Sequence, residues 1–127
     1  MGYLIDSNVI ANYFSNSFSE RAMNFLADVI NDISNISVIT KIEVLSWRNP
    51  NVAKEHAVRI FVNYCNVIAL SDAIVDQCID IRRIRKIKTP DAIIAATAKV
   101  YNFTLITSDS DFNHIPDLQI IDPFKIN

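Results

Sequence analysis

Long apolar runs and glycine are both scarce in this sequence of 127 residues. The longest stretch without a charged residue, Ser7–Ser19, has 13 residues and is rich in Asn and Ser, whereas a membrane-spanning helix needs about 20 mostly apolar residues. We therefore expect no transmembrane segment and no membrane partner. The single glycine implies that the turns depend on Asn, Ser, Asp and Pro.

Cysteine and targeting signals are also scarce. Cys65 and Cys78 lack CxxC spacing and a neighbouring His, so we expect reduced thiols in the core rather than a metal or redox site. The segment Met1–Asp6 has neither the basic region nor the apolar stretch of a signal peptide. The sequence therefore predicts a cytoplasmic protein.

The composition indicates one folded unit. Apolar residues make up 50% of the chain and charged residues only 20%, which argues against disorder. A chain of this length can bury one continuous core, so we expect residues 1–127 to form a single domain.

Short apolar runs alternate with longer segments of helical spacing. The predicted strands are Tyr3–Ile5, Ile36–Ile39, Val67–Leu70, Thr104–Thr107 and Leu118–Ile121. The predicted helices are Phe18–Asn31, Thr40–Trp47, Val52–Cys65, Ser71–Ile87 and Pro90–Tyr101. This order predicts an α/β fold with three layers, α/β/α, around a central parallel sheet of four or five strands.

Several helix ends are marked by capping patterns. Ser17–Glu20 and Thr40–Glu43 both fit the capping box, and Thr89–Asp91 places an N-cap, a proline and a carboxylate in the usual order. Asn102 stands where a left-handed residue would end the last helix.

Five acidic residues follow predicted strands or open predicted helices. They are Asp6, Glu43, Asp91, Asp109 and Asp111. Since ligands of open parallel sheets gather beyond the carboxyl ends of the strands, we expect several of these carboxylates to share one cleft. Taken singly, Glu43 is explained by the capping box, Asp91 by the helix dipole, and Asp109 and Asp111 by a turn.

Crowded carboxylates need protons or cations. Two full charges 4 Å apart repel by roughly 4 kcal/mol at an effective dielectric constant of 20. A set of oxygen ligands without His or Cys suits Mg²⁺ or Mn²⁺, which can activate water for attack on a phosphodiester bond. The acidic residues therefore predict a metal-dependent nuclease.

Four segments resemble, in order, the motifs of PIN-domain proteins. They are residues 6–10 (DSNVI), 40–45 (TKIEVL), 90–98 (PDAIIAATA) and 105–112 (LITSDSDF). The size and the third motif are most similar to VapC-type toxins of toxin–antitoxin pairs. This resemblance implies a Mg²⁺- or Mn²⁺-dependent endoribonuclease, usually a homodimer, that is inhibited by a cognate antitoxin.

The resemblance also implies roles for individual residues. Asp6, Glu43, Asp91 and Asp109 match the catalytic acids. Of these, Asp6, Asp91 and Asp109 would bind the metal directly, and Glu43 directly or through water. Asn8, Thr40 and Thr107 match polar residues that support the site. The last motif is one residue shorter than in many relatives, so Asp111 is an alternative to Asp109, which we favour because it lies nearer the strand end.

A basic segment contrasts with the net charge of −2. Residues 82–88 hold five of the 12 basic residues and no acid. On the predicted helix Arg82, Arg85 and Lys86 share one face, and Lys88 approaches the helix of Asp91, so these four residues are candidates for RNA binding. A solvated helix end is the alternative explanation.

Two other functional classes remain open from the sequence. A phosphoacceptor receiver domain has a similar length and metal use, but Asp6 has no acidic neighbour and Lys125 lies in the tail. A PIN-like module could instead bind RNA or protein without cleavage. Apolar residues of the helices Phe18–Asn31 and Val52–Cys65, with the corner at Trp47, are candidate homodimer or antitoxin surfaces.

Overall fold

The computed structural model describes residues 2–127 and contains a parallel sheet of five strands. The strands are β1 (Tyr3–Ile5), β2 (Asn35–Ser37), β3 (Asn66–Ile68), β4 (Thr104–Ile106) and β5 (Ile120–Ile121). Their order in the sheet is β3-β2-β1-β4-β5, and every neighbouring pair is parallel. The predicted α/β fold is confirmed.

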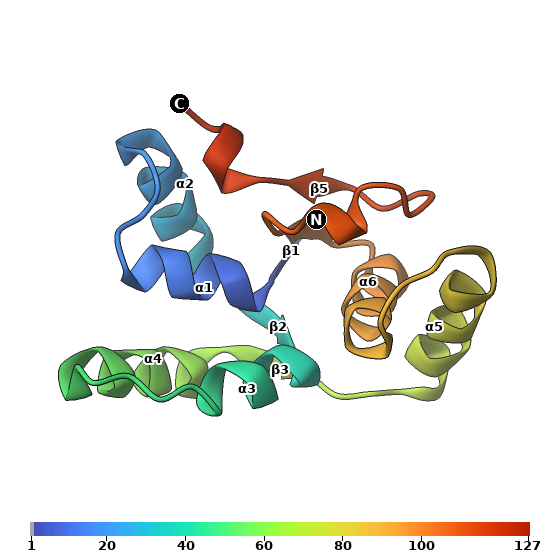
Figure 1. Ribbon diagram of the computed structural model, residues 1–127, viewed down its shortest axis with the longest axis horizontal. Helices are drawn as coiled ribbons and strands as arrows, with labels where there is room; N and C mark the ends of the chain where they lie inside the picture. The colour runs from blue at the N-terminus through green and yellow to red at the C-terminus, as the bar shows by residue number, and fades with distance from the viewer. Residues whose placement is uncertain (1) are drawn as a thin grey trace.

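Six helices flank the sheet (Figure 1). They are α1 (Ser7–Phe14), α2 (Glu20–Asn31), α3 (Val38–Leu45), α4 (Val52–Tyr64), α5 (Asp72–Ile84) and α6 (Thr89–Tyr101), and two 3₁₀ turns follow β4 and β5. None of the helices in residues 2–127 is both long and apolar enough to cross a membrane.

Alternating strand side chains separate two cores, one on each face of the sheet. Leu4 and Leu105 pack with α5 and α6, whereas Ile5 and Ile106 pack with α1, α2 and α4. Successive residues of a strand point to opposite faces, so each short strand contributes to both layers. The result is the expected three-layer arrangement.

The helix α1 was not predicted. Its sequence contains Asn and Ser, which have modest helix propensity, and its cap is Asp6, which the sequence interpretation assigned only to the site. The Asp6 carboxylate accepts a hydrogen bond from the backbone N–H of Ser7, and Val9 and Ile10 are buried. Burial of this apolar face outweighs the weak propensity of the segment.

Three capping predictions were wrong. Ser19, not Ser17, caps α2, because its hydroxyl accepts the N–H of Ala22. Ser37 caps α3, three residues before the predicted cap Thr40, so Thr40 lies inside the helix. Lys88 rather than Thr89 precedes α6. In contrast, Asn102 does adopt the predicted left-handed conformation, with φ 56°.

Candidate active site

The carboxyl edge of the central strands brings the first polar residues together. Ile5 of β1 pairs with Ile106 of β4, and the backbone N–H of Asp6 donates to the Ile106 carbonyl at 3.0 Å. The next residues along each strand, Asp6 and Thr107, are consequently neighbours although they are far apart in sequence. The Thr107 hydroxyl donates to Oδ2 of Asp6 at 2.8 Å.

Asp6 is a buried carboxylate with both oxygens hydrogen-bonded. It is 5% exposed, its Oδ1 accepts the Ser7 N–H at 2.8 Å, and its Oδ2 also accepts from Nδ2 of Asn8 at 2.9 Å. A buried charge is tolerated only when such partners, a counter-ion or a proton compensate for the lost water. The hydrogen bonds therefore fix the orientation of this carboxylate.

Asn8 links the strand ends on the other side of Asp6. Its Nδ2 also donates to the Thr107 hydroxyl at 3.2 Å, and its Oδ1 accepts from both the backbone N–H and the hydroxyl of Ser108. The amide thus uses its donor and acceptor groups within one network. Asn8 holds the loop after β4 against the start of α1.

Glu43 reaches the same edge from α3. Its Oε1 accepts a hydrogen bond of 2.6 Å from the Ser7 hydroxyl, and its side chain is partly exposed. A short bond between a hydroxyl and a carboxylate is charge-assisted and stronger than a neutral one. Ser7 therefore fixes Glu43 beside Asp6, through a contact between α1 and α3.

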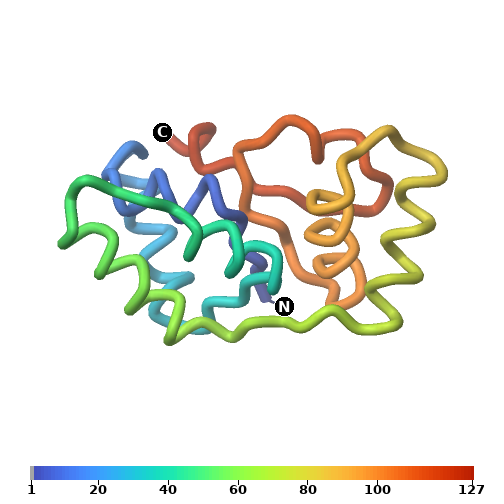
Figure 2. The backbone as a smooth tube through the Cα atoms, turned by 60° about the horizontal axis from the view of Figure 1, so that its bottom comes forward, coloured from blue at the N-terminus to red at the C-terminus, as the bar shows by residue number. Residues whose placement is uncertain are grey.

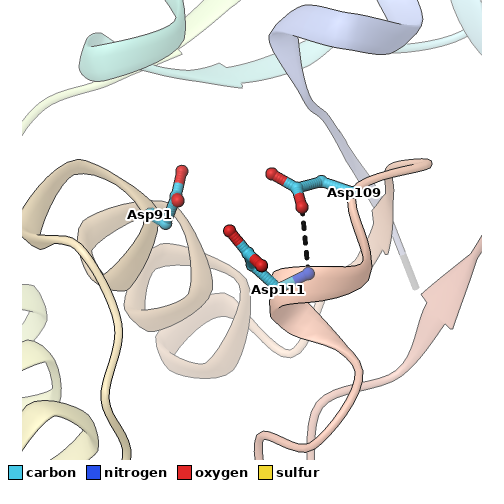
Figure 3. A group of neighbouring side chains, drawn as sticks. All are labelled: Asp91, Asp109 and Asp111. Atoms are coloured by element: carbon cyan, nitrogen blue, oxygen red, sulfur yellow. Dashed lines mark hydrogen bonds between the residues drawn. The ribbon is translucent and has the colours of Figure 1, made fainter.

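A second group of carboxylates comes from α6 and the turn after β4 (Figure 3). Asp91 is in the first turn of α6, and Asp109 and Asp111 follow β4. One carboxylate oxygen from each of the three residues lies within 4.8 Å of the others. Asp109 Oδ1 also accepts the N–H of Asp111 at 2.9 Å, which fixes the turn that carries both residues.

Burial and neighbouring charges change the ionisation of Asp91 and Asp6. Burial is the main cause that raises the pKa of Asp91 to about 6, and the charges of Asp109, Asp6, Glu43 and Asp111 raise it further. Burial also raises the pKa of Asp6, against hydrogen bonds from Thr107 and Ser7 that lower it. The charges of Glu43 and Asp109 also raise the pKa of Asp6. All five predicted acids therefore lie close enough to interact.

The geometry fits a hard divalent cation. Oxygen ligands without His or Cys are typical of Mg²⁺ and Mn²⁺ sites. Burial first, and the neighbouring acids second, raise the pKa of Asp91, and a bound cation would offset both effects. The sequence favours Asp109 over Asp111 as a metal ligand. In the structure both residues belong to the group around Asp91, so the structure gives no preference between them.

Thr40 is placed differently from the other predicted supporting residues. It is fully buried, and its hydroxyl has no hydrogen-bond partner among the described residues. It lies one turn before Glu43 on α3, and residues three apart on a helix share a face. Its supporting role remains a prediction.

The predicted basic helix face is wrong. Helix α5 ends at Ile84, and Arg85 has an extended backbone with φ −136° and ψ 143°. Arg82 is therefore on the helix, whereas Arg85, Lys86 and Lys88 are in the loop that leads to α6 and Asp91. The Nε of Arg82 donates to the Ile87 carbonyl at 3.3 Å, within this loop.

Two polar residues of the site were not identified from the sequence. Ser7 orients Glu43, and Ser108 binds the Asn8 amide. Prediction of a helix starting after Asp6 would have placed the Ser7 side chain at the carboxyl edge. No sequence signal separates Ser108 from the other polar residues of its loop.

Comparison with known proteins gives consistent results. The sequence model of the PIN domain matches residues 3–118. A chain of a toxin–antitoxin complex from Klebsiella pneumoniae is 30% identical with a TM-score of 0.78, and the match covers 98% of this chain and 100% of that one. A chain of VapBC-1 from nontypeable Haemophilus influenzae is 25% identical with a TM-score of 0.77, and the match covers 98% of this chain and 100% of that one. No curated protein matches the chain.

Proposed function

Because this chain belongs to the PIN-domain family and is of the VapC type, we propose that it is a metal-dependent endoribonuclease, the toxin of a VapBC-type toxin–antitoxin pair. The observation that carries the proposal is the convergence of five carboxylates at the carboxyl edge of the sheet. PIN domains are generally nucleases, and membership of the family removes the receiver-domain alternative. We propose that residues 1–127 act as one domain, in the cytoplasm.

Asp91, Asp109 and Asp111 are the residues that would hold Mg²⁺ or Mn²⁺, with Asp6 beside them and Glu43 acting directly or through water. When bound, the ion would activate water and neutralise charge on the leaving oxygen of a phosphodiester. The hydrogen bonds of Asn8 and Thr107 orient Asp6, and that of Ser7 orients Glu43. This chain's own contribution is to hold the carboxylates in place before the substrate binds.

Arg82, Arg85, Lys86 and Lys88 are proposed to bind the RNA backbone. The loop of Arg85 to Lys88 leads directly into α6, so its positive charges lie at the approach to Asp91. Contacts of this kind attract phosphates without reading the base sequence. Because the helix ends before Arg85, the side chains of Arg85, Lys86 and Lys88 are free to follow an irregular single strand.

We also propose a homodimer and a cognate antitoxin as partners. A pocket of about 190 Å³ lies between α3 and α4 and is lined by Trp47, with Val44 and Val58 as apolar residues and Arg48 and Arg59 as cations. An apolar pocket rimmed by charge is a suitable surface for a protein segment that carries an aromatic or aliphatic anchor.

The test of the nuclease proposal is cleavage of RNA with Mg²⁺ or Mn²⁺ by the wild type, Asp6→Asn and Asp91→Asn. We expect the wild type to cleave RNA and the Asp6→Asn and Asp91→Asn variants not to, and we expect chelation of the metal to stop cleavage by the wild type. The control is Asp28→Asn, which removes an exposed carboxylate beside the pocket at the amino ends of the strands. Equal cleavage by all four proteins would contradict the proposal, and binding of RNA without cleavage would favour a non-cleaving module.

A further inference from the structure

A pocket of about 610 Å³ lies at the amino edge of the sheet, opposite the edge that carries the catalytic carboxylates. Its walls come from the first residues of β1, β2 and β3 and from the ends of α2 and α6. Figure 2 shows the start of β1, the end of α2 and the end of α6 on the same lower side of the molecule. The pocket is therefore separate from the candidate active site.

Aromatic rings form much of the wall of this pocket. Tyr101 and Phe103 are stacked, with ring centroids 5.4 Å apart and an interplanar angle of 11°. Tyr3 meets Phe25 edge to face, with ring centroids 5.7 Å apart. Gly2 is the one glycine of the sequence, and a Cβ at this position would lie 2.7 Å from a ring carbon of Phe103. The lack of a side chain at Gly2 therefore allows the Phe103 ring to pack on the backbone beside Tyr101.

Two acidic residues line the same pocket without a cation beside them. Asp28 is in the last turn of α2 and Asp32 is its C-cap, and both are exposed. The last turn of α2 has no basic residue, and no Lys, Arg or His among residues 2–127 lines the pocket. The carboxyl end of a helix carries partial negative charge, which favours cations and disfavours acids. The charge of this wall is therefore complementary to a positively charged ligand.

The spacing of the two acids indicates the size of the ligand. Residues four apart on a helix share a face and are separated by about 6 Å along its axis. Two ammonium groups joined by four methylene groups are also about 6 Å apart, since each bond is about 1.5 Å long. Ammonium groups bind aromatic faces as well as carboxylates, and the methylene chain can pack on the rings. The same acids disfavour a phosphate or a nucleic acid as the occupant.

We propose that this pocket binds an aliphatic diamine, with one ammonium group at Asp28, the other at Asp32 and the methylene chain against the aromatic wall. A lysine side chain of a protein partner would bring only one ammonium group, so the pair of acids favours a free diamine. The site shares no residue with the proposed nuclease centre, and its occupancy does not depend on RNA cleavage.

The test is titration calorimetry of the full chain with 1,4-diaminobutane. We expect saturable binding of one diamine per chain, and binding of n-butylamine that is about threefold to fivefold weaker, because one ion pair is lost. Asp28→Asn and Asp32→Asn should each weaken diamine binding by a similar factor. Tyr101→Leu should also weaken it, whereas Tyr101→Phe should retain it, because the ring and not the hydroxyl binds the cation. Asp80→Asn, which removes an exposed acid of α5 outside the pocket, is the matched control.

The carboxylates of the candidate active site could also attract a diamine, so Asp91→Asn is measured beside the other variants. This variant should bind the diamine as the wild type does. Weaker binding by Asp91→Asn together with unchanged binding by Asp28→Asn would place the diamine at the active site and overturn the proposal. Absence of saturable binding, or equal affinities for the diamine and n-butylamine, would overturn it as well. Circular dichroism checks that each variant is folded, and no measurement needs nuclease activity, so failure of this site and failure of the proposed function are distinguishable.

Discussion

Thr107 offers the sharpest test of how the site is held together. Its side chain is 1% exposed, donates to Asp6 Oδ2 at 2.8 Å and accepts from the backbone N–H of Asp109 at 3.1 Å. Thr107→Val keeps nearly the same shape and removes the oxygen that makes these bonds. The substitution therefore isolates polar contacts rather than packing.

The expected loss of unfolding free energy for Thr107→Val is about 2–3 kcal/mol at neutral pH. A hydrogen bond to a charged acceptor contributes about 1.5–3 kcal/mol, and a buried N–H without an acceptor adds to the cost. The control is Thr97→Val, which is equally buried but donates only to the Ile93 carbonyl of its own helix at 2.7 Å. We expect less than about 1 kcal/mol there, because that carbonyl keeps its helical partner.

The assay is urea unfolding of the metal-free proteins at several pH values. Because the Thr107 hydrogen bond lowers the pKa of Asp6, the loss should diminish as the pH falls and Asp6 becomes protonated. The Thr97 control should show no such dependence. Equal losses for the two variants at every pH would refute the assigned role of Thr107.

Further predictions concern ionisation and ligand orientation. Because the pKa of Asp91 is raised from 3.8 to about 6, the metal-free protein should lose stability as the pH rises through this window. Because the Asp91 side chain is partly exposed, the unfolding free energy should fall by only about 1–2 kcal/mol over this window, and Asp91→Asn should remove this pH dependence. With saturating Mg²⁺, the stability measured by thermal unfolding should instead increase with pH, because the ion binds only deprotonated carboxylates. Ser7→Ala should weaken Mg²⁺ binding about tenfold by calorimetry, as loss of a residue that orients a ligand does, and Ser7→Thr should retain it. Unchanged affinity in Ser7→Ala would show that Glu43 needs no such support.

Much of the fold was accessible from the sequence because buried parallel strands have a distinctive composition. Each predicted strand overlaps an observed one, and Tyr3–Ile5 is matched at both ends. The acidic residues could be assigned to one edge because all five strands are parallel, so residues after β1 and β4 must lie at the same end of the sheet. Topology alone therefore located Asp6 and Asp109.

The errors arise where tertiary contacts override local patterns. Helix α1 has little intrinsic propensity, and it forms because Val9 and Ile10 are buried under the sheet. The pattern of Thr40–Glu43 fits a capping box, but Ser37 at the end of β2 starts the helix earlier and moves Thr40 into the core. At Arg85 the helical pattern of charges continues, yet the chain must turn there so that α6 can return along the sheet.

Asp6 and Asp91 have different energetic roles, which separates stability from catalysis in this site. Asp6 caps α1 and accepts three hydrogen bonds, so Asp6→Asn disturbs the fold as well as the charge. The Asp91 carboxylate has no hydrogen-bond partner within residues 2–127, and burial beside other acids makes its charge unfavourable without a cation. Asp91→Asn should therefore stabilise the metal-free protein while it abolishes cleavage. Replacement of a residue that serves only the fold would instead lower both the stability and the cleavage activity.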